Sequence, residues 1–113
     1  MRAMRLSPLD PLSYVFRFGL AFANFLMRRY EEALEWAEQS AREQPRYVPP
    51  LRLKVVICAL LDRLEDAQSS LRQLLELSPG LTMANFDASV PGISPEYREV
   101  CAEGLRKAGL LER

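Results

Sequence analysis

The pentapeptide Arg29-Tyr30-Glu31-Glu32-Ala33 recurs at a 34-residue offset as Arg63-Leu64-Glu65-Asp66-Ala67. Other identities at this spacing are Pro11, Pro45 and Pro79, Leu26 and Leu60, and Gln39 and Gln73. A fixed period of this length is typical of solenoids, in which each unit of two helices buries its apolar face against its neighbours. The sequence therefore predicts an all-α fold, a right-handed stack of about two helical hairpins closed by a C-terminal capping helix.

This repeat divides the chain into four parts. We expect residues 1–8 to be the end of a truncated preceding repeat, 9–45 the first unit, 46–79 the second unit, and 80–113 a connector and capping helix. The first part is assigned because Leu6-Ser7-Pro8 matches Leu77-Ser78-Pro79, which closes the second unit. The alternative for these first residues is a natural start followed by a short extended arm.

Prolines and glycines set the expected helix bounds. We predict helices over about 11–27, 30–43, 49–61 and 65–77, since proline is favoured at the first helical position and disfavours a helical residue before it. A last helix begins at Ser94-Pro95-Glu96, which supplies a cap, a proline and an early acid, and it ends at Gly109. No segment shows the alternating pattern of a strand.

Composition narrows the classes of partner. The 113 residues carry 15 basic and 15 acidic side chains, so no excess positive charge is available to neutralise nucleic-acid phosphates or an anionic membrane surface. The longest apolar run, 55–61, is far shorter than the roughly 20 residues that span a bilayer. No charged-then-apolar leader opens the sequence, so a cytoplasmic location is expected. We therefore expect neither nucleic acid nor membrane as a partner.

Residues with catalytic or metal-binding chemistry are scarce. The chain has no histidine, the commonest general base and a usual zinc ligand, and no glycine-rich phosphate loop. Cys58 and Cys101 lie on apolar helical faces, where buried, inert thiols are expected. The carboxylates of Glu31-Glu32 and Glu65-Asp66 favour helix starts through the helix dipole. The sequence predicts a non-catalytic protein without metal or cofactor.

At these positions the chain resembles the tetratricopeptide repeat, a family of helical hairpins. The matching residues, which the resemblance assigns to packing within and between repeats, are Leu20, Ala21, Ala33 and Pro45 in the first unit and Val55, Ala67 and Pro79 in the second. The small residues allow close helix approach in that family. Several typical residues are replaced, the tryptophan by Arg17 and Leu51 and the tyrosine by Asn24 and Cys58.

A narrower resemblance concerns the C-terminal part. Residues 102–110, the connector that follows Leu77-Ser78-Pro79, and residues 7–11 are similar to the C-terminal regions of bacterial multidomain proteins in which such repeats follow an adenylate cyclase or a winged-helix regulator domain. The resemblance implies that this chain is the C-terminal fragment of a larger signalling protein, with any catalytic domain upstream.

One group of aromatic residues on the first predicted helix could bind a partner. Tyr14, Phe18, Phe22 and Phe25 form an aromatic stripe on the first helix, and the resemblance places it on the concave, ligand-binding face. Arg52 and Arg63 could add a polar rim, or could be solvated surface residues. The alternatives for the stripe are packing against a preceding repeat and contact with the C-terminal segment. A second apolar side of the same helix carries Phe16, Leu20, Ala23 and Met27, so we expect it to be buried on both sides.

Three functions remain open from the sequence. The first is a protein–protein interaction or self-association module, whose partner is a peptide, a helix or a second copy in a homodimer. The second is an intramolecular regulatory tail acting on an attached cyclase or transcriptional-regulator domain. The third is a small-ligand binder that uses the aromatic stripe. A closed pocket beside Phe18, Phe22 and Phe25 would favour the third.

Overall fold

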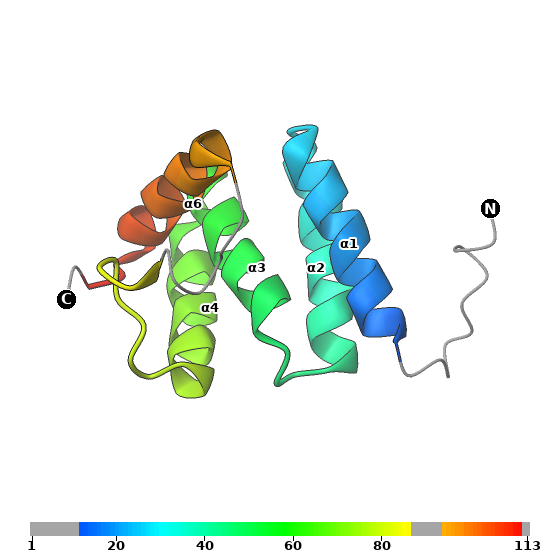
Figure 1. Cartoon of the computed structure of the whole chain (residues 1–113), viewed down its shortest axis with the longest axis horizontal. Helices are drawn as coiled ribbons and strands as arrows, with labels where there is room; N and C mark the ends of the chain where they lie inside the picture. The colour runs from blue at the N-terminus through cyan, green and yellow to red at the C-terminus, as the bar shows by residue number, and fades with distance from the viewer. Residues whose placement is uncertain (1–11, 87–93, 112–113) are drawn as a thin grey trace.

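A computed structural model of the chain describes residues 12–86 and 94–111. Within these ranges the protein consists of five α-helices without any strand, so the predicted all-helical class is confirmed there (Figure 1). The helices are α1 (Ser13–Leu26), α2 (Tyr30–Glu43), α3 (Val48–Leu60), α4 (Leu64–Leu77) and α6 (Pro95–Ala108).

The first four helices form two hairpins, α1 with α2 and α3 with α4, that lie side by side (Figure 1). The second hairpin packs on the first chiefly through α3, which contacts α2 more extensively than α1. The last helix, α6, lies against α3 and touches α4 at fewer positions. The helix α3 therefore sits between all its neighbours, at the centre of the molecule.

The turns inside the two hairpins have the same backbone conformation. Arg28 and Asp62 both adopt a left-handed φ of 61°, an uncommon conformation for a residue other than glycine. The next residue in each turn closes it with a backbone hydrogen bond, from Arg29 N–H to the Asn24 carbonyl (2.9 Å) and from Arg63 N–H to the Cys58 carbonyl (2.8 Å). The helices that follow, α2 and α4, have the same length and begin and end at the same 34-residue offset.

Small residues lie where the helices meet. Ala33 and Ala67 are fully buried, and each donates its N–H to the carbonyl four residues earlier at 2.9 Å. Ala21 and Val55, the paired small residues of the first helices, are also fully buried. Leu20 is half-buried, and Pro45 and Pro79 are exposed just beyond the ends of α2 and α4.

Helix ends follow the predicted chemistry at most positions. Glu31 and Glu32 lie in the first turn of α2, and Glu65 and Asp66 in that of α4. The Ser94 hydroxyl accepts a hydrogen bond from the N–H of Tyr97, which caps α6, and Gly109 ends that helix with φ 106°. These caps satisfy backbone groups that a helix end otherwise leaves to water.

Two helix starts differ from the prediction. The helix α1 begins at Ser13 rather than at Pro11, and its N-cap, Leu12, has no side-chain oxygen to accept a backbone hydrogen bond. The helix α3 begins at Val48, one residue before the predicted start at Pro49-Pro50, because the first turn of a helix tolerates proline. Asp10, Pro11, the predicted truncated repeat at 1–8 and part of the connector lie outside the described residues.

The last helix approaches α3 closely at Gly104. A Cβ atom built there would lie 2.9 Å from both the Cα and the Cγ1 atoms of Val56 in α3, so only glycine fits without movement. The segments that flank α6 also join the core, where Leu81, Phe86 and Leu110 are buried. A backbone hydrogen bond of 2.7 Å from Met83 N–H to the Leu111 carbonyl ties these two segments together.

We predict that Gly104→Ala destabilises the protein. Alanine favours a helix by roughly 0.5–1 kcal/mol over glycine, but overpacking against the Val56 backbone costs about 1–3 kcal/mol, so the expected net loss is about 1 kcal/mol. Urea unfolding followed by circular dichroism measures it. Glu103→Ala, on the exposed side of the same helix, is the matched control and should change stability little. Equal stability of the two variants would contradict close packing at Gly104.

Candidate functional site

The aromatic stripe of α1 contacts two tyrosines from other parts of the chain. Tyr47, in the link before α3, meets Tyr14 and Phe18 edge-to-face, with ring centroids 4.9 and 6.0 Å apart. Tyr97, in the first turn of α6, meets Phe22 and Phe25 in the same way at 5.0 and 5.3 Å. Edge-to-face pairs of this kind contribute about 0.5–1.5 kcal/mol each beyond the area they bury.

At Phe22 and Phe25 the structure shows contact with the C-terminal segment, through Tyr97, and Phe25 is only 4% exposed. Tyr14, Phe18 and Phe22 are half-buried. Tyr47 and Tyr97 complete this cluster, yet the sequence predicts no role for them beyond packing, because nothing in their spacing relates them to α1.

The two arginines predicted as a polar rim lie in different surroundings. Arg52 is half-buried beside Tyr97, Cys101 and Tyr47, and burial lowers the pKa of its guanidinium. Arg63 is exposed and forms an ion pair of 2.5 Å with Glu31 of the first hairpin. Arg52 thus belongs to the α6 side of α3, while Arg63 joins the starts of α2 and α4.

The cysteines are buried free thiols, as the sequence predicts. Burial raises the pKa of both thiols, which disfavours the reactive thiolate. Burial also raises the pKa of the Tyr97 hydroxyl, and the nearby Cys101 thiol acts in the same direction. These groups favour the neutral form and hence a packing role.

The outer side of α1 is apolar and largely exposed within the single chain, so the described part of the chain does not itself provide the burial expected on both sides of α1. Among the residues predicted for this side, Ala23 and Met27 are exposed and Phe16 and Leu20 are half-buried. Large apolar side chains that reach solvent extend this surface, namely Leu12 (62% exposed), Val15 (41%), Leu26 (56%) and Met27 (56%). No helix in the described part of the chain packs here. We call this surface the outer face of α1.

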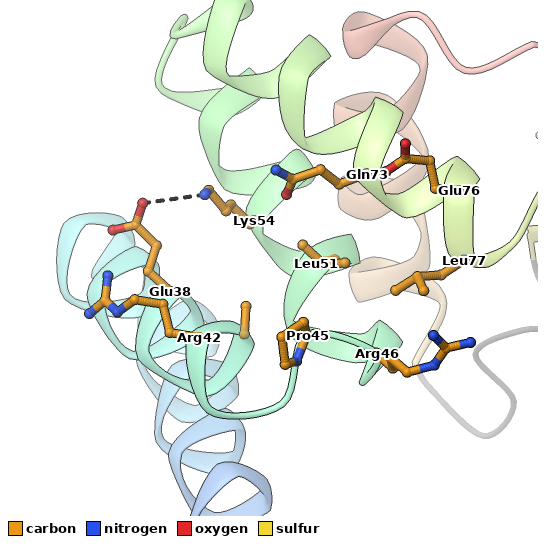
Figure 2. A pocket seen from close by; sticks show the side chains of 10 residues that line it. Glu38, Arg42, Pro45, Arg46, Leu51, Lys54, Gln73, Glu76 and Leu77 are labelled. Carbon is orange, nitrogen blue, oxygen red and sulfur yellow. Dashed lines mark ion pairs between the residues drawn. The ribbon is translucent and has the colours of Figure 1, made fainter.

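A groove lies on another side of the molecule, between α2 and α4 (Figure 2). Its volume is about 690 Å³, and Leu51 of α3 lies at its floor. Figure 2 shows Arg42, Pro45 and Arg46 along the end of α2 and the turn that follows it. The opposite wall comes from α4, through Gln73, Glu76 and Leu77. We call this surface the α2/α4 groove.

Two of the charged side chains in the groove form an ion pair with each other. The Lys54 ammonium lies 3.4 Å from the Glu38 carboxylate, on the dashed line in Figure 2. Arg42, Arg46 and Glu76 are exposed, and no ion pair joins them to another described residue. Nothing in the sequence indicates this groove, because its walls come from three helices and most of its residues are typical of an ordinary solvated surface.

Other features of the described residues offer little for chemistry. The hollow beside Phe25 and Tyr97 measures about 120 Å³, well below the roughly 300–1,000 Å³ of small-molecule sites. The described part holds no group of three or more cysteine, aspartate or glutamate side chains placed to bind a metal. It also contains no helix with the length and apolar character required to cross a membrane.

Comparison with known proteins adds no assignment. No protein-family model matches the chain, and neither a curated protein nor a solved structure matches it.

We predict that the free energy of unfolding falls as pH rises from 8 to 10.5. Burial raises the pKa of Tyr97 and of Cys101 in the folded protein, so the unfolded chain releases these protons first and is stabilised as pH rises. Tyr97→Phe keeps the ring contacts but removes the titrating hydroxyl, so its fall should be smaller by about 1 kcal/mol. Urea unfolding at both pH values checks this, and equal falls in the two proteins would contradict it.

Proposed function

We propose that this chain is a non-catalytic protein-interaction module of the tetratricopeptide-repeat class, and that it pairs with a second copy of itself through the outer face of α1. The repeat assignment is supported by the two hairpin turns with identical φ and by the 34-residue offset of α2 and α4. The pairing is supported by a difference in burial between the first helices of the two hairpins. The same side of the helix is exposed in α1 and buried in α3.

The helices α1 and α3 carry corresponding sides that differ in exposure. At the 34-residue offset, Gly19 and Ala23 of α1 correspond to Leu53 and Ile57 of α3, which are almost fully buried. Ile57 lies one turn from Lys54, whose ammonium pairs with Glu38 of α2, so this side of α3 faces the first hairpin. The outer face of α1 thus corresponds to the side of α3 that is buried against the first hairpin. This observation carries the proposal.

The composition of the face suits pairing with itself. A twofold interface brings the same residues together, so charge on the face would meet like charge. The helix α1 contains a single charged residue, Arg17, and it turns inward to pair with Glu43 at 2.6 Å. At the middle of the face, Gly19 has no atom within 4 Å of a built Cβ, which lets a second helix approach closely.

The size of the face is adequate for a weak to moderate dimer. Exposed apolar residues extend from Leu12 to Met27, about 22 Å along the helix. A standard stable interface buries about 800 Å² on each partner, and apolar burial stabilises by roughly 25 cal/mol per Å². The outer face belongs to one helix of 14 residues, with the half-buried Phe16 and Leu20 at its margins, so it buries less than this standard area, in keeping with a weak to moderate dimer.

We predict that the chain forms a dimer at tens of micromolar, measured by sedimentation velocity. Leu26→Glu places like charges opposite each other in a twofold interface, so this variant should sediment as a monomer. Leu64→Glu is the matched control: Leu64 is also an exposed leucine (41%), but it lies on α4, and the variant should remain a dimer.

Two results would count against this function. A wild-type monomer at several hundred micromolar would refute the pairing and favour the alternative of a regulatory tail, in which an attached domain covers the outer face of α1. Loss of the dimer in both leucine variants would show that the interface lies elsewhere. Circular dichroism of each variant confirms that its helices are intact.

A further inference from the structure

We propose that two copies of the chain pair with their α1 helices antiparallel and crossing at Gly19, and that Leu12 of each copy fills the hollow between α1 and α6 of the other. This inference rests on the proposed function, because it describes how the outer face of α1 is used. It goes further in making α6 of each copy part of the interaction site.

The exposed residues of α1 and its N-cap are arranged symmetrically about Gly19. From residue 12 to residue 26 the exposed positions are Leu12, Val15, Gly19, Ala23 and Leu26. They lie seven and four residues before Gly19 and four and seven residues after it. Reversing the direction of the helix therefore maps this surface onto itself, so an antiparallel twofold contact joins matching positions. Leu12 then lies opposite Leu26 of the other copy, as Val15 lies opposite Ala23.

Gly19 allows the two helices to meet closely at the centre of this surface. A Cβ atom built at Gly19 would meet no atom of the described residues within 4 Å. Gly104 differs, because Val56 occupies the space that a side chain there would need. Glycine in the middle of a helix lowers its stability relative to alanine. The close crossing of a second α1 gives Gly19 a role that the described part of one chain does not.

The hollow beside Phe25 and Tyr97 lies at one end of this surface, where the end of α1 is next to the start of α6 (Figure 1). Its volume is about 120 Å³, near the roughly 150 Å³ of a cavity that holds one benzene-sized apolar group. Its apolar lining comes from α1, α2 and α6, through Phe25, Leu26, Tyr30, Tyr97 and Val100. Because Leu26 also belongs to the outer face of α1, the two surfaces are continuous. We call it the α1/α6 hollow.

Leu12 is the side chain that the antiparallel arrangement brings to the α1/α6 hollow. It lies opposite Leu26, which forms part of the wall of the hollow. Leu12 is 62% exposed, more than any other large apolar residue of the outer face, and it stands at the N-cap of α1. In a parallel pair Leu12 would meet its own copy instead, and the hollow would be left to water.

Charge and area agree with this arrangement. Arg28 and Glu96 border the hollow, are exposed and have opposite signs, so they add no net charge there. Antiparallel helices also place the N-terminus of one α1 beside the C-terminus of the other, which the helix dipoles favour. The contact with α6 adds buried area to an outer face that alone is smaller than a standard interface.

The orientation is tested by cross-linking the double variant Val15→Cys/Ala23→Cys, in which both positions are exposed. The native thiols of Cys58 and Cys101 are buried, so mild oxidation should join only the introduced sulfurs. Peptide mass spectrometry should find position 15 of one copy linked to position 23 of the other. Within one helix these positions are about 12 Å apart, which is too far for a disulfide inside the chain.

The single variants Val15→Cys and Ala23→Cys are the matched controls. Each should stay unlinked, because equal positions of two antiparallel helices that cross at Gly19 lie about 12 Å apart along the axis. Links that join two positions 15, or two positions 23, would show parallel helices and overturn the proposal. The absence of any link in the dimer of the double variant would also overturn it.

Val100→Phe tests the α1/α6 hollow, since the larger ring fills it from α6. The dissociation constant of the dimer, measured by sedimentation equilibrium, should rise about tenfold. Glu103→Phe adds the same ring on the exposed side of α6 and should leave the constant within about twofold. An unchanged constant in Val100→Phe would contradict the placement of Leu12. Urea unfolding verifies that both variants fold.

Failure of the proposed function and failure of this inference give different results. A wild-type monomer would refute both. A dimer without the link from 15 to 23, or one that Val100→Phe does not weaken, would refute only the arrangement. Leu26→Glu weakens either orientation, through like charges in a parallel pair and through a carboxylate against Leu12 in an antiparallel one. It therefore reports on the outer face of α1, and the cysteine variants report on the orientation.

Discussion

Burial of α3 on every side is the constraint on which the rest of the structure depends. Its consecutive residues from Val55 to Ala59 are all buried, so no side of this helix faces water over more than a full turn. Such burial requires helices on several sides, and α2, α4 and α6 supply them. The helix α3 lies between α2 and α4 and holds them apart, which leaves the groove above Leu51. The helix α6 lies across α3, and this position brings Tyr97 into contact with the aromatic stripe of α1.

The sequence predicts much of this framework because local rules determine it. Proline, capping serine, early acids and a terminal glycine set the helix bounds to within about two residues, and the repeated Arg29 and Arg63 mark the two hairpin turns. The left-handed residues themselves, Arg28 and Asp62, are not glycines and carry no such signal. The apolar run at 55–61, whose length excludes a membrane span, is also a sign of all-round burial.

The interaction surfaces depend on contacts between residues that are far apart in the sequence, and rules about neighbouring residues do not predict such contacts. Tyr97 contacts Phe22 of α1, which lies at the other end of the described chain, and nothing in the spacing of either residue indicates that contact. The groove combines Arg42 from α2 with Glu76 from α4, and each alone resembles a solvated surface charge. Arg52 was expected at a rim and is half-buried under α6, because the position of α6 decides its exposure. The position of each residue in the fold, more than its type, determines which residues it contacts and how exposed it is.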